Sequence, residues 1–262
     1  MKIKRILFFA LILSLFTSID VKAQIKVGLD NWFNNETNAK TGKPFHYLWN
    51  DSAFSGYSRF GKIFEKNGAV LSTLKKPTRS ELSRINIYIL VDPDTTTENP
   101  TPNYILKDDA KTIVKWVKKG GVLIILANDA LNCEFTHLNQ LAANFGMYFN
   151  HVTLHPVIGD KYEMGSFTSF PNHPLFKGVS KIFLKEISSI KIWGPAKPVL
   201  TEGPITLMAE AQIGKGFVFA VGDPWIYNEY IDHDILPASF DNRKAAENLV
   251  GFLMSKVAVK KK

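Results

Sequence analysis

Four apolar runs in this chain each end on Asp or Asn, and this repetition constrains the fold more than any other feature of the sequence. The runs are residues 27–31, 89–94, 124–129 and 219–224. Short runs rich in Val and Ile are typical of strands buried on both faces, which in soluble proteins belong to a parallel sheet flanked by helices. Ligands bind beyond the carboxyl ends of such strands, so we expect the four polar ends to meet at one edge.

The remaining periodicity predicts one mixed α/β domain. Amphipathic patterns predict helices at residues 55–66, 106–119, 136–145 and 242–254, and further apolar runs predict strands at 69–74, 85–91 and 122–127. From Met147 onward, short runs broken by Gly and Pro predict antiparallel strands appended to the sheet, at 149–154, 182–184, 187–192 and 199–201. Two runs around Gly214 and Lys215, at 207–212 and 217–221, predict a hairpin.

The first 23 residues have the pattern of an export leader. Lys2, Lys4 and Arg5 form a basic segment, residues 6–16 are apolar, and Ala23 offers the small residue at a cleavage site. The apolar segment is too short to span a bilayer comfortably, and no Cys lies near the cut, so we expect no membrane or lipid anchor. The expected organisation is a leader at 1–23, one α/β domain at 24–256 and a basic tail at 257–262, in a periplasmic protein.

The net charge limits the classes of binding partner, and the cysteine content limits the covalent cross-links. The formal net charge is +8 at pH 7, with part of the excess in the leader and the tail. A mild positive excess suits an acidic glycan, whereas export and the absence of clustered Arg argue against nucleic acid. Cys133 is the single cysteine, so no intramolecular disulfide can form.

Two kinds of catalytic centre are not expected. Asn128 and Asp129 stand where a class I glutamine amidotransferase carries its nucleophile, and Cys133 comes only later in the chain. A thiol nucleophile needs an activating base and a fixed position, and a free Cys is more often an inert apolar side chain. The six histidines show no zinc-site spacing, so we expect neither a metal nor a cofactor.

Aromatic residues gather beside the expected polar edge. They are Trp32, Phe33, Tyr47, Trp49, Trp225 and Tyr227. Sugar rings stack their C–H faces on aromatic planes while Asn and Asp bond the hydroxyls, so this combination favours a saccharide cleft. The alternative is ordinary core filling, for which Phe33 is the best candidate.

Two strings carry a resemblance to a known family. They are residues 172–179, Asn-His-Pro-Leu-Phe-Lys-Gly-Val, and Gly222-Asp223 followed by Asn228. With the order of elements, they resemble the glutamine-amidotransferase-like exported domains of bacterial polysaccharide utilisation loci, found alone or with unsaturated rhamnogalacturonyl hydrolases. The chain looks most similar to stand-alone oligosaccharide dehydratases of ulvan degradation. The resemblance implies a flavodoxin-like sheet without the amidotransferase Cys, working alongside polysaccharide lyases and unsaturated uronyl hydrolases.

The leading hypothesis is a carbon–oxygen lyase that removes water from the non-reducing end of uronate- and rhamnose-containing oligosaccharides and leaves a 4,5-unsaturated sugar. His46 and His137 are both candidate bases, and Tyr227 is the candidate acid. Arg59 or Lys215 would supply countercharge to the substrate carboxylate. The residues expected to bind substrate are Asn31, Trp32, Trp49, Asp92, Asp94, Asn128, Asp129, Asp223, Trp225 and Asn228.

Two alternatives belong to other classes. Asp92 and Asp223 could act as acid and base of a glycoside hydrolase if the fold sets them at the right separation. The domain could also bind glycan without catalysis. At this stage Asp223 could equally serve only to cap the turn after its strand.

Overall fold

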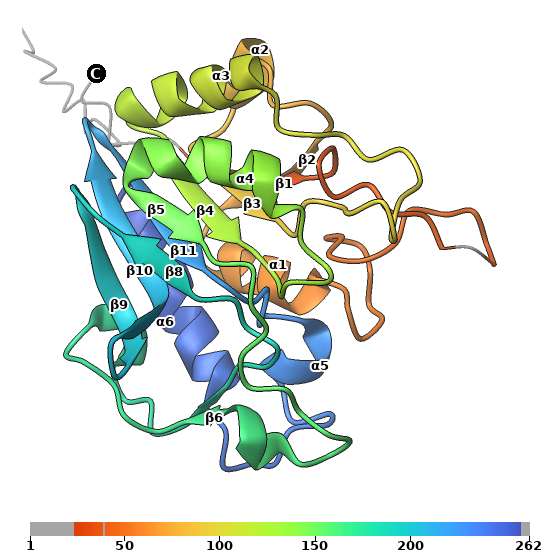
Figure 1. Cartoon of the computed structure of the whole chain (residues 1–262), viewed down its shortest axis with the longest axis vertical. Coiled ribbons are helices and arrows are strands. Elements are labelled where there is room, and N and C mark those ends of the chain that lie inside the picture. The colour runs from red at the N-terminus through yellow and green to blue at the C-terminus, as the bar shows by residue number, and fades with distance from the viewer. Residues whose placement is uncertain (1–23, 39, 258–262) are drawn as a thin grey trace, which may run out of the picture.

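The structure is a computed structural model that describes residues 24–38 and 40–257. The expected leader and nearly all of the expected tail lie outside these residues. A seven-stranded sheet forms the centre of the molecule, in the order β2-β1-β3-β4-β11-β10-β9 (Figure 1). Its strands are β1 (Lys26–Asp30), β2 (Val70–Leu74), β3 (Ile87–Val91), β4 (Val122–Leu126), β9 (Ala196–Glu202), β10 (Ile205–Ile213) and β11 (Gly216–Val221). The first five strands in this order are parallel, and β10 and β9 continue the sheet antiparallel. A mostly parallel sheet is thus confirmed.

Helices cover both faces of the sheet because the central strands bury both. In β4, Val122, Ile124 and Leu126 belong to one core cluster, and Leu123 and Ile125 to the other. The first cluster includes side chains of α1 (Ser58–Lys66) and α6 (Asn242–Ser255). The second includes side chains of α2 (Arg79–Leu82), α3 (Lys107–Lys118) and α4 (Phe135–Ala142). The chain therefore forms three layers, with α1 and α6 on the opposite side of the sheet from α3 and α4 (Figure 1).

Two predicted helices differ from the structure at their ends. α1 begins at Ser58 rather than residue 55, because the preceding segment forms turns in which Tyr57 N–H donates to the Leu48 carbonyl. The predicted helix at 136–145 is α4 followed by a tighter 3₁₀ turn, Ala143–Phe145, which ends at left-handed Gly146.

The prediction that all the later short strands join the sheet is wrong. Of the four predicted runs, the one at 199–201 does so, as β9. The other three runs contribute to separate two-stranded pairs. Residues 150–154 of the first run lie outside any strand. These pairs are β5 (Met147–Phe149) with β8 (Ile190–Ile192), and β6 (Ser166–Phe167) with β7 (Ile182–Phe183). Phe149 and Ile190 pack into the second core cluster instead. Such short strands are stable here because they lie on an existing apolar surface.

The connecting segments between β5 and α6 add three short helical elements: the 3₁₀ turns Tyr162–Gly165 and Pro174–Phe176, and α5 (Asn228–Ile231), which follows β11. Within residues 24–38 and 40–257, no helix is long and apolar enough to cross a membrane.

The four polar strand ends lie along one edge of the sheet, as predicted. β1, β3, β4 and β11 are consecutive neighbours and run in the same direction. Asp30, Asp92, Asn128 and Asp223 end or closely follow these strands, so they occupy the same side. We call this side the polar edge.

Gly222, just after β11, is packed against the backbone of Ser188. A Cβ at Gly222 would lie 1.8 Å from the Ser188 carbonyl oxygen, and the Ser188 N–H donates to the Gly222 carbonyl over 2.9 Å. The absence of a side chain is therefore what lets the chain leave the sheet at this point.

We expect Gly222→Ala to destabilise the fold by about 1 to 3 kcal/mol, the usual cost of forcing an atom into a packed interior. Urea unfolding of the variant and of Gly251→Ala checks this, since a Cβ at Gly251 in α6 meets nothing within 4 Å. Equal midpoints for Gly222→Ala and the wild type would contradict the expectation.

Candidate functional site

Asp92 is the centre of a hydrogen-bonded cluster at the polar edge. Its Oδ2 accepts a hydrogen bond from the Tyr47 hydroxyl at 2.7 Å and another from Asn128 Nδ2 at 2.8 Å. The residue has a left-handed backbone with φ of +38°, a conformation that is uncommon outside glycine and that points to a local structural constraint. Asp92 thus joins three segments of the chain: the loop after β1, the end of β3 and the end of β4.

Tyr47 and Tyr227 form a pair of phenols beside Asp92. Their hydroxyl oxygens are 3.4 Å apart and their ring centroids 5.5 Å apart. Burial raises the pKa of both hydroxyls well above the usual value, and the neighbouring carboxylates raise it further. Tyr227 keeps partial exposure whereas Tyr47 is buried. Both phenols are therefore proton donors rather than tyrosinates.

His46 is held by Glu36 of the same loop. Its Nδ1 lies 2.8 Å from Glu36 Oε1. A carboxylate at Nδ1 favours the tautomer with the proton there, which leaves Nε2 to accept a proton. His46 and Tyr47 also have left-handed backbones, with φ of +59° and +49°. We call Glu36, His46, Tyr47, Asp92, Asn128 and Tyr227 the edge cluster.

Carboxyl groups crowd the edge cluster, and burial raises their pKa values. Desolvation raises the pKa of Asp92 well above its ordinary value, and the charge of Glu98 raises it further. Desolvation raises the pKa of Asp94 to about 6 and that of Glu98 to about 7. Oδ1 of Asp92 and Oδ1 of Asp94 are buried without a hydrogen-bond partner in the part of the chain that the structure describes. Raised pKa values reduce the negative charge on these carboxyls, and with it the repulsion between them.

Two other acidic residues at the edge hold turns. Asp30 Oδ2 accepts the backbone N–H groups of residues 32–34, and its Oδ1 accepts the Tyr88 hydroxyl at 2.6 Å. Burial raises the Asp30 pKa to about 7 despite these bonds. Asp129 Oδ1 accepts the Leu131 N–H at 2.7 Å. The side chain of Asp129 is therefore occupied by its own loop.

Asp223 and Asn228 connect the segment after β11 to its surroundings. Asp223 Oδ2 accepts the Lys185 N–H at 2.8 Å, and desolvation raises the Asp223 pKa to about 8. Asn228 donates to the carbonyls of Asp51 and Ala53 and accepts from Arg59 N–H. With 1% exposure, Asn228 fixes the loop after β1 rather than facing a ligand.

The predicted aromatic platform is only partly at the surface. Trp225 is 1% exposed, so it has no free face for a sugar, and its indole N–H is buried without a partner among the described residues. Phe33 is fully buried, as the core-filling alternative anticipated. Trp49 packs on Phe60 and Phe64, and its Nε1–H donates to the Ser72 carbonyl. Correcting the prediction, Trp225 and Trp49 serve mainly as packing residues.

Asn31 and Trp32 keep partial exposure at the end of β1. Asn31 Nδ2 reaches the Asn34 carbonyl at 3.4 Å, and Lys76 Nζ lies 5.8 Å from the Trp32 ring centroid. Asp94 Oδ2 accepts bonds from Asn35 N–H and Asn99 Nδ2. These residues line the loop side of the edge without contacting the Asp92 carboxyl.

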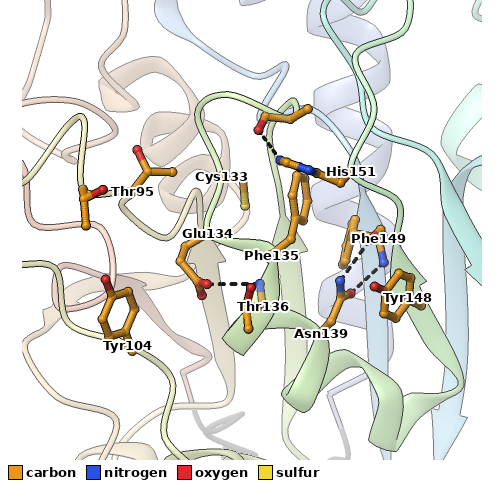
Figure 2. Close-up of a pocket in the computed structure, with 12 residues that line it drawn as sticks. Thr95, Tyr104, Cys133, Glu134, Phe135, Thr136, Asn139, Tyr148, Phe149 and His151 are labelled. Atoms are coloured by element: carbon orange, nitrogen blue, oxygen red, sulfur yellow. Dashed lines mark hydrogen bonds between the residues drawn. The ribbon is translucent and has the colours of Figure 1, made fainter.

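A pocket of about 580 Å³ opens beside the loops that follow β3 and β4 and the start of α4 (Figure 2). It lies between Thr95 in the loop after β3, Glu134 and Phe135 at the start of α4, and Tyr148 of β5. We call it the α4 pocket. His137 stacks on Tyr104, a pocket residue, with centroids 4.6 Å apart, and its Nδ1 lies 3.1 Å from Glu134 Oε2. The two predicted bases therefore occupy different places, His46 in the edge cluster and His137 beside this pocket.

Of the two predicted sources of countercharge, Lys215 lies away from the polar edge and Arg59 is already paired with acidic residues. Lys215 lies in the β10–β11 turn, where β11 begins, so it is at the opposite end of the sheet from the polar edge. Arg59 is paired with Asp232 and Asp234 and also donates to the Asn228 carbonyl. Lys185 is nearer to the edge, since its charge lowers the pKa of Asp223.

Three charged residues at the polar edge were not predicted from the sequence: Glu36, Glu98 and Lys185. Glu36 precedes His46 by ten residues in one loop, and a carboxylate and an imidazole in the same functional loop are a signal that could have been used. No group of three or more His, Cys, Asp or Glu side chains suited to a metal occurs in the described residues. Cys133 is buried, and burial raises its thiol pKa, which disfavours the reactive thiolate.

Comparisons with known proteins give the fold alone. No family model matches the chain, and no curated protein matches it at a significant level. Among solved structures, the mmIFT52 N-terminal domain has a TM-score of 0.66 at 14% identity, over 88% of this chain and 97% of that one. Cytoplasmic protein STM1381 from Salmonella typhimurium LT2 has a TM-score of 0.59 at 12% identity, over 90% and 100%. The beta-galactosidase from Rahnella sp. R3 has a TM-score of 0.51 at 11% identity, over 90% of this chain and 32% of that one.

The raised pKa values predict how stability depends on pH. The Asp223 pKa is about 8 in the folded protein, so the folded state keeps a proton that the unfolded state releases near pH 4. The contribution of Asp223 is therefore most favourable below pH 4 and is lost as the pH rises toward 8, by at most about 1.4 kcal/mol per pH unit.

Asp223→Asn should flatten this dependence and raise stability at pH 8, since the amide oxygen still accepts the Lys185 N–H without a buried charge. Urea unfolding between pH 4 and 8 measures it, with exposed Asp160→Asn as control. A slope in Asp223→Asn equal to that of the wild type would show that Asp223 is ionised throughout.

Proposed function

We propose that this protein is an exported, carbohydrate-active carbon–oxygen lyase with a flavodoxin-like sheet. It dehydrates the non-reducing end of uronate- and rhamnose-containing oligosaccharides, such as those of ulvan, to a 4,5-unsaturated sugar. The observation that carries the proposal is the edge cluster, which holds a base and an acid together. His46 has its Nδ1 bonded to Glu36, and Tyr227 is a protonated, partly exposed phenol beside Tyr47 and Asp92.

These groups match the two proton transfers of the elimination. His46 Nε2 takes the proton from C5, next to the uronate carboxylate, and the C–H electron pair becomes the C4–C5 double bond. The C4 hydroxyl leaves as water with the proton of Tyr227. Tyr47, whose hydroxyl contacts both Tyr227 and Asp92, offers a route by which the phenol regains its proton.

Partly neutral carboxyls favour an acidic substrate at this edge. Glu98, with a pKa of about 7, holds a proton about half of the time near neutral pH, and burial also raises the pKa of Asp92. The Glu98 residue is partly exposed, so its protonated carboxyl can donate a hydrogen bond to a substrate carboxylate, whereas an ionised carboxyl would repel it. Asn128 Nδ2 adds an amide donor beside Asp92. Together these groups can balance the charge that develops on the uronate carboxylate in the transition state.

Burial favours elimination over the hydrolase alternative. A glycosidase needs two carboxyls that face the sugar. Asp92 and Asp223 are 2% and 3% exposed, and each accepts a hydrogen bond within the protein. His46 and Tyr227 are partly exposed residues, in contrast to Asp92 and Asp223.

The two strings that carry the family resemblance have structural roles consistent with a shared fold. His173 Nδ1 accepts the Leu175 N–H at the start of a 3₁₀ turn, and Asn248 Nδ2 donates to the carbonyls of Leu175 and Lys177. Gly222 gives the strand exit described above. The leader pattern at 1–23 supports a periplasmic location. There the protein would work alongside polysaccharide lyases, and unsaturated uronyl hydrolases would consume its product.

Incubation with ulvan oligosaccharides that carry a saturated uronate at the non-reducing end should lower their mass by one water and raise the ultraviolet absorbance of an unsaturated uronate. His46→Ala should slow this reaction by about 10²- to 10⁴-fold, the usual contribution of a general base. Liquid chromatography with mass spectrometry measures both.

His137→Ala is the matched variant, since His137 is the other candidate base but lies outside the edge cluster. We expect it to keep the rate within a few-fold of the wild type. A large loss in His137→Ala with His46→Ala unaffected would move the base to the α4 pocket. Cleavage with the gain of one water would establish hydrolysis instead, and an unchanged mass spectrum would exclude both enzymes.

A further inference from the structure

An exposed aromatic and basic surface adjoins the α4 pocket on the small β5–β8 sheet. Tyr148 of β5 and Trp193, just after β8, are each 45% exposed. Tyr148 is paired with Lys191 across the two strands, and Lys191 is also exposed. Side chains alternate between the faces of a strand, so Tyr148, Lys191 and Trp193 project from the same face, away from buried Met147, Phe149 and Ile190.

These residues line a second hollow of about 480 Å³ together with Asn150. Tyr148 lines both this hollow and the α4 pocket, so the two are contiguous. The α4 pocket in turn begins at Thr95 and Cys133, next to Asp94, which forms a β-bridge with Cys133. We call the two adjoining hollows the groove, whose inner end lies at Thr95 and Cys133 and whose outer end lies at Trp193. Each has the volume of an ordinary small-ligand site.

The composition of the groove changes along its length. The α4 pocket offers the hydroxyls of Thr95, Tyr104 and Thr136, and its acidic residue, Glu134, is already bonded to the N–H groups of Thr136 and His137. The outer hollow has two exposed rings, an amide and the cation of Lys191. Hydroxyl-bearing sugar rings suit the inner part, and a ring that carries a carboxylate suits the outer part, where it can stack on an aromatic face and pair with an ammonium group.

We infer that this groove is an extended subsite for an acidic oligosaccharide, with a uronate residue over Trp193 and Lys191. The inference rests on the proposed function for the direction of the chain: the non-reducing end reacts at the edge cluster, and the rest of the oligosaccharide runs toward β8. The groove therefore selects chains longer than a disaccharide.

Isothermal titration calorimetry tests the inference separately from turnover. The probes are a uronate–rhamnose tetrasaccharide, the corresponding disaccharide and the same tetrasaccharide with its carboxyls reduced to alcohols. Trp193→Ala should weaken binding of the tetrasaccharide by about tenfold, the cost of one lost stacking contact. Trp193→Phe should restore most of that loss, and disaccharide binding should change less than twofold in both variants.

Lys191→Ala should weaken binding of the acidic tetrasaccharide by a few-fold and leave the carboxyl-reduced one unchanged. Lys244→Ala, an exposed lysine on α6 across the sheet, is the charge control. Tetrasaccharide binding that is equal in the wild type and Trp193→Ala, or absent in the wild type, overturns the groove. If binding depends on Trp193 but no water is lost from any probe, the groove stands and the lyase proposal fails.

Discussion

The hydrogen bond from Tyr47 to Asp92 is the contact on which the arrangement of the site depends. It spans 45 residues of sequence and ties the long loop after β1 to the end of β3. His46 precedes Tyr47, and both have left-handed backbones, so fixing Tyr47 also fixes His46 near the phenols. A hydrogen bond to a buried carboxyl is costly to break, because the partner left behind cannot recover a bond from water. The hydrogen bond to Asp92 therefore offsets the cost of the left-handed backbone at His46 and Tyr47.

Asp92 is held through its side chain and its backbone carbonyl from both sides of β3. Asn128, from the end of β4, donates to the oxygen that Tyr47 uses, while Asn34 donates to the Asp92 carbonyl. The parallel order of β1, β3 and β4 is what brings these three donors to one point. In an antiparallel arrangement the ends of neighbouring strands would lie at opposite edges, and the loop after β1 would have no partner there.

Sequence periodicity predicted the framework because its signals are local. The Val and Ile runs of β3, β4 and β11 and the apolar stripes of α3 and α6 need no knowledge of distant contacts. The small sheets were mispredicted because the short runs of β5 and β8 have no intrinsic preference for one partner. They pair where the second core cluster leaves an apolar surface.

The site was predicted less completely for the same physical reason. Polar residues at the ends of strands could be grouped through the parallel sheet, so Asp92, Asn128 and Asp223 were expected at one edge. Whether a side chain there faces a ligand or holds a loop depends on packing: Trp225 and Asn228 turned inward, and Asp129 bonded to its own turn. Glu36 and Glu98 were not predicted because their roles depend on which residues the fold places next to them. Glu36 contacts His46, and the charge of Glu98 raises the pKa of Asp92.

The central claim is that burial keeps the Asp92 carboxyl and the hydroxyls of the tyrosine pair protonated beside His46. The most direct measurement is carbon-13 nuclear magnetic resonance of the aspartate carboxyls between pH 4 and 9, with Asp92→Asn to assign the resonance. The account predicts an Asp92 carboxyl that is still protonated at pH 7. A carboxylate that titrates near the ordinary value of 3.8 would contradict it.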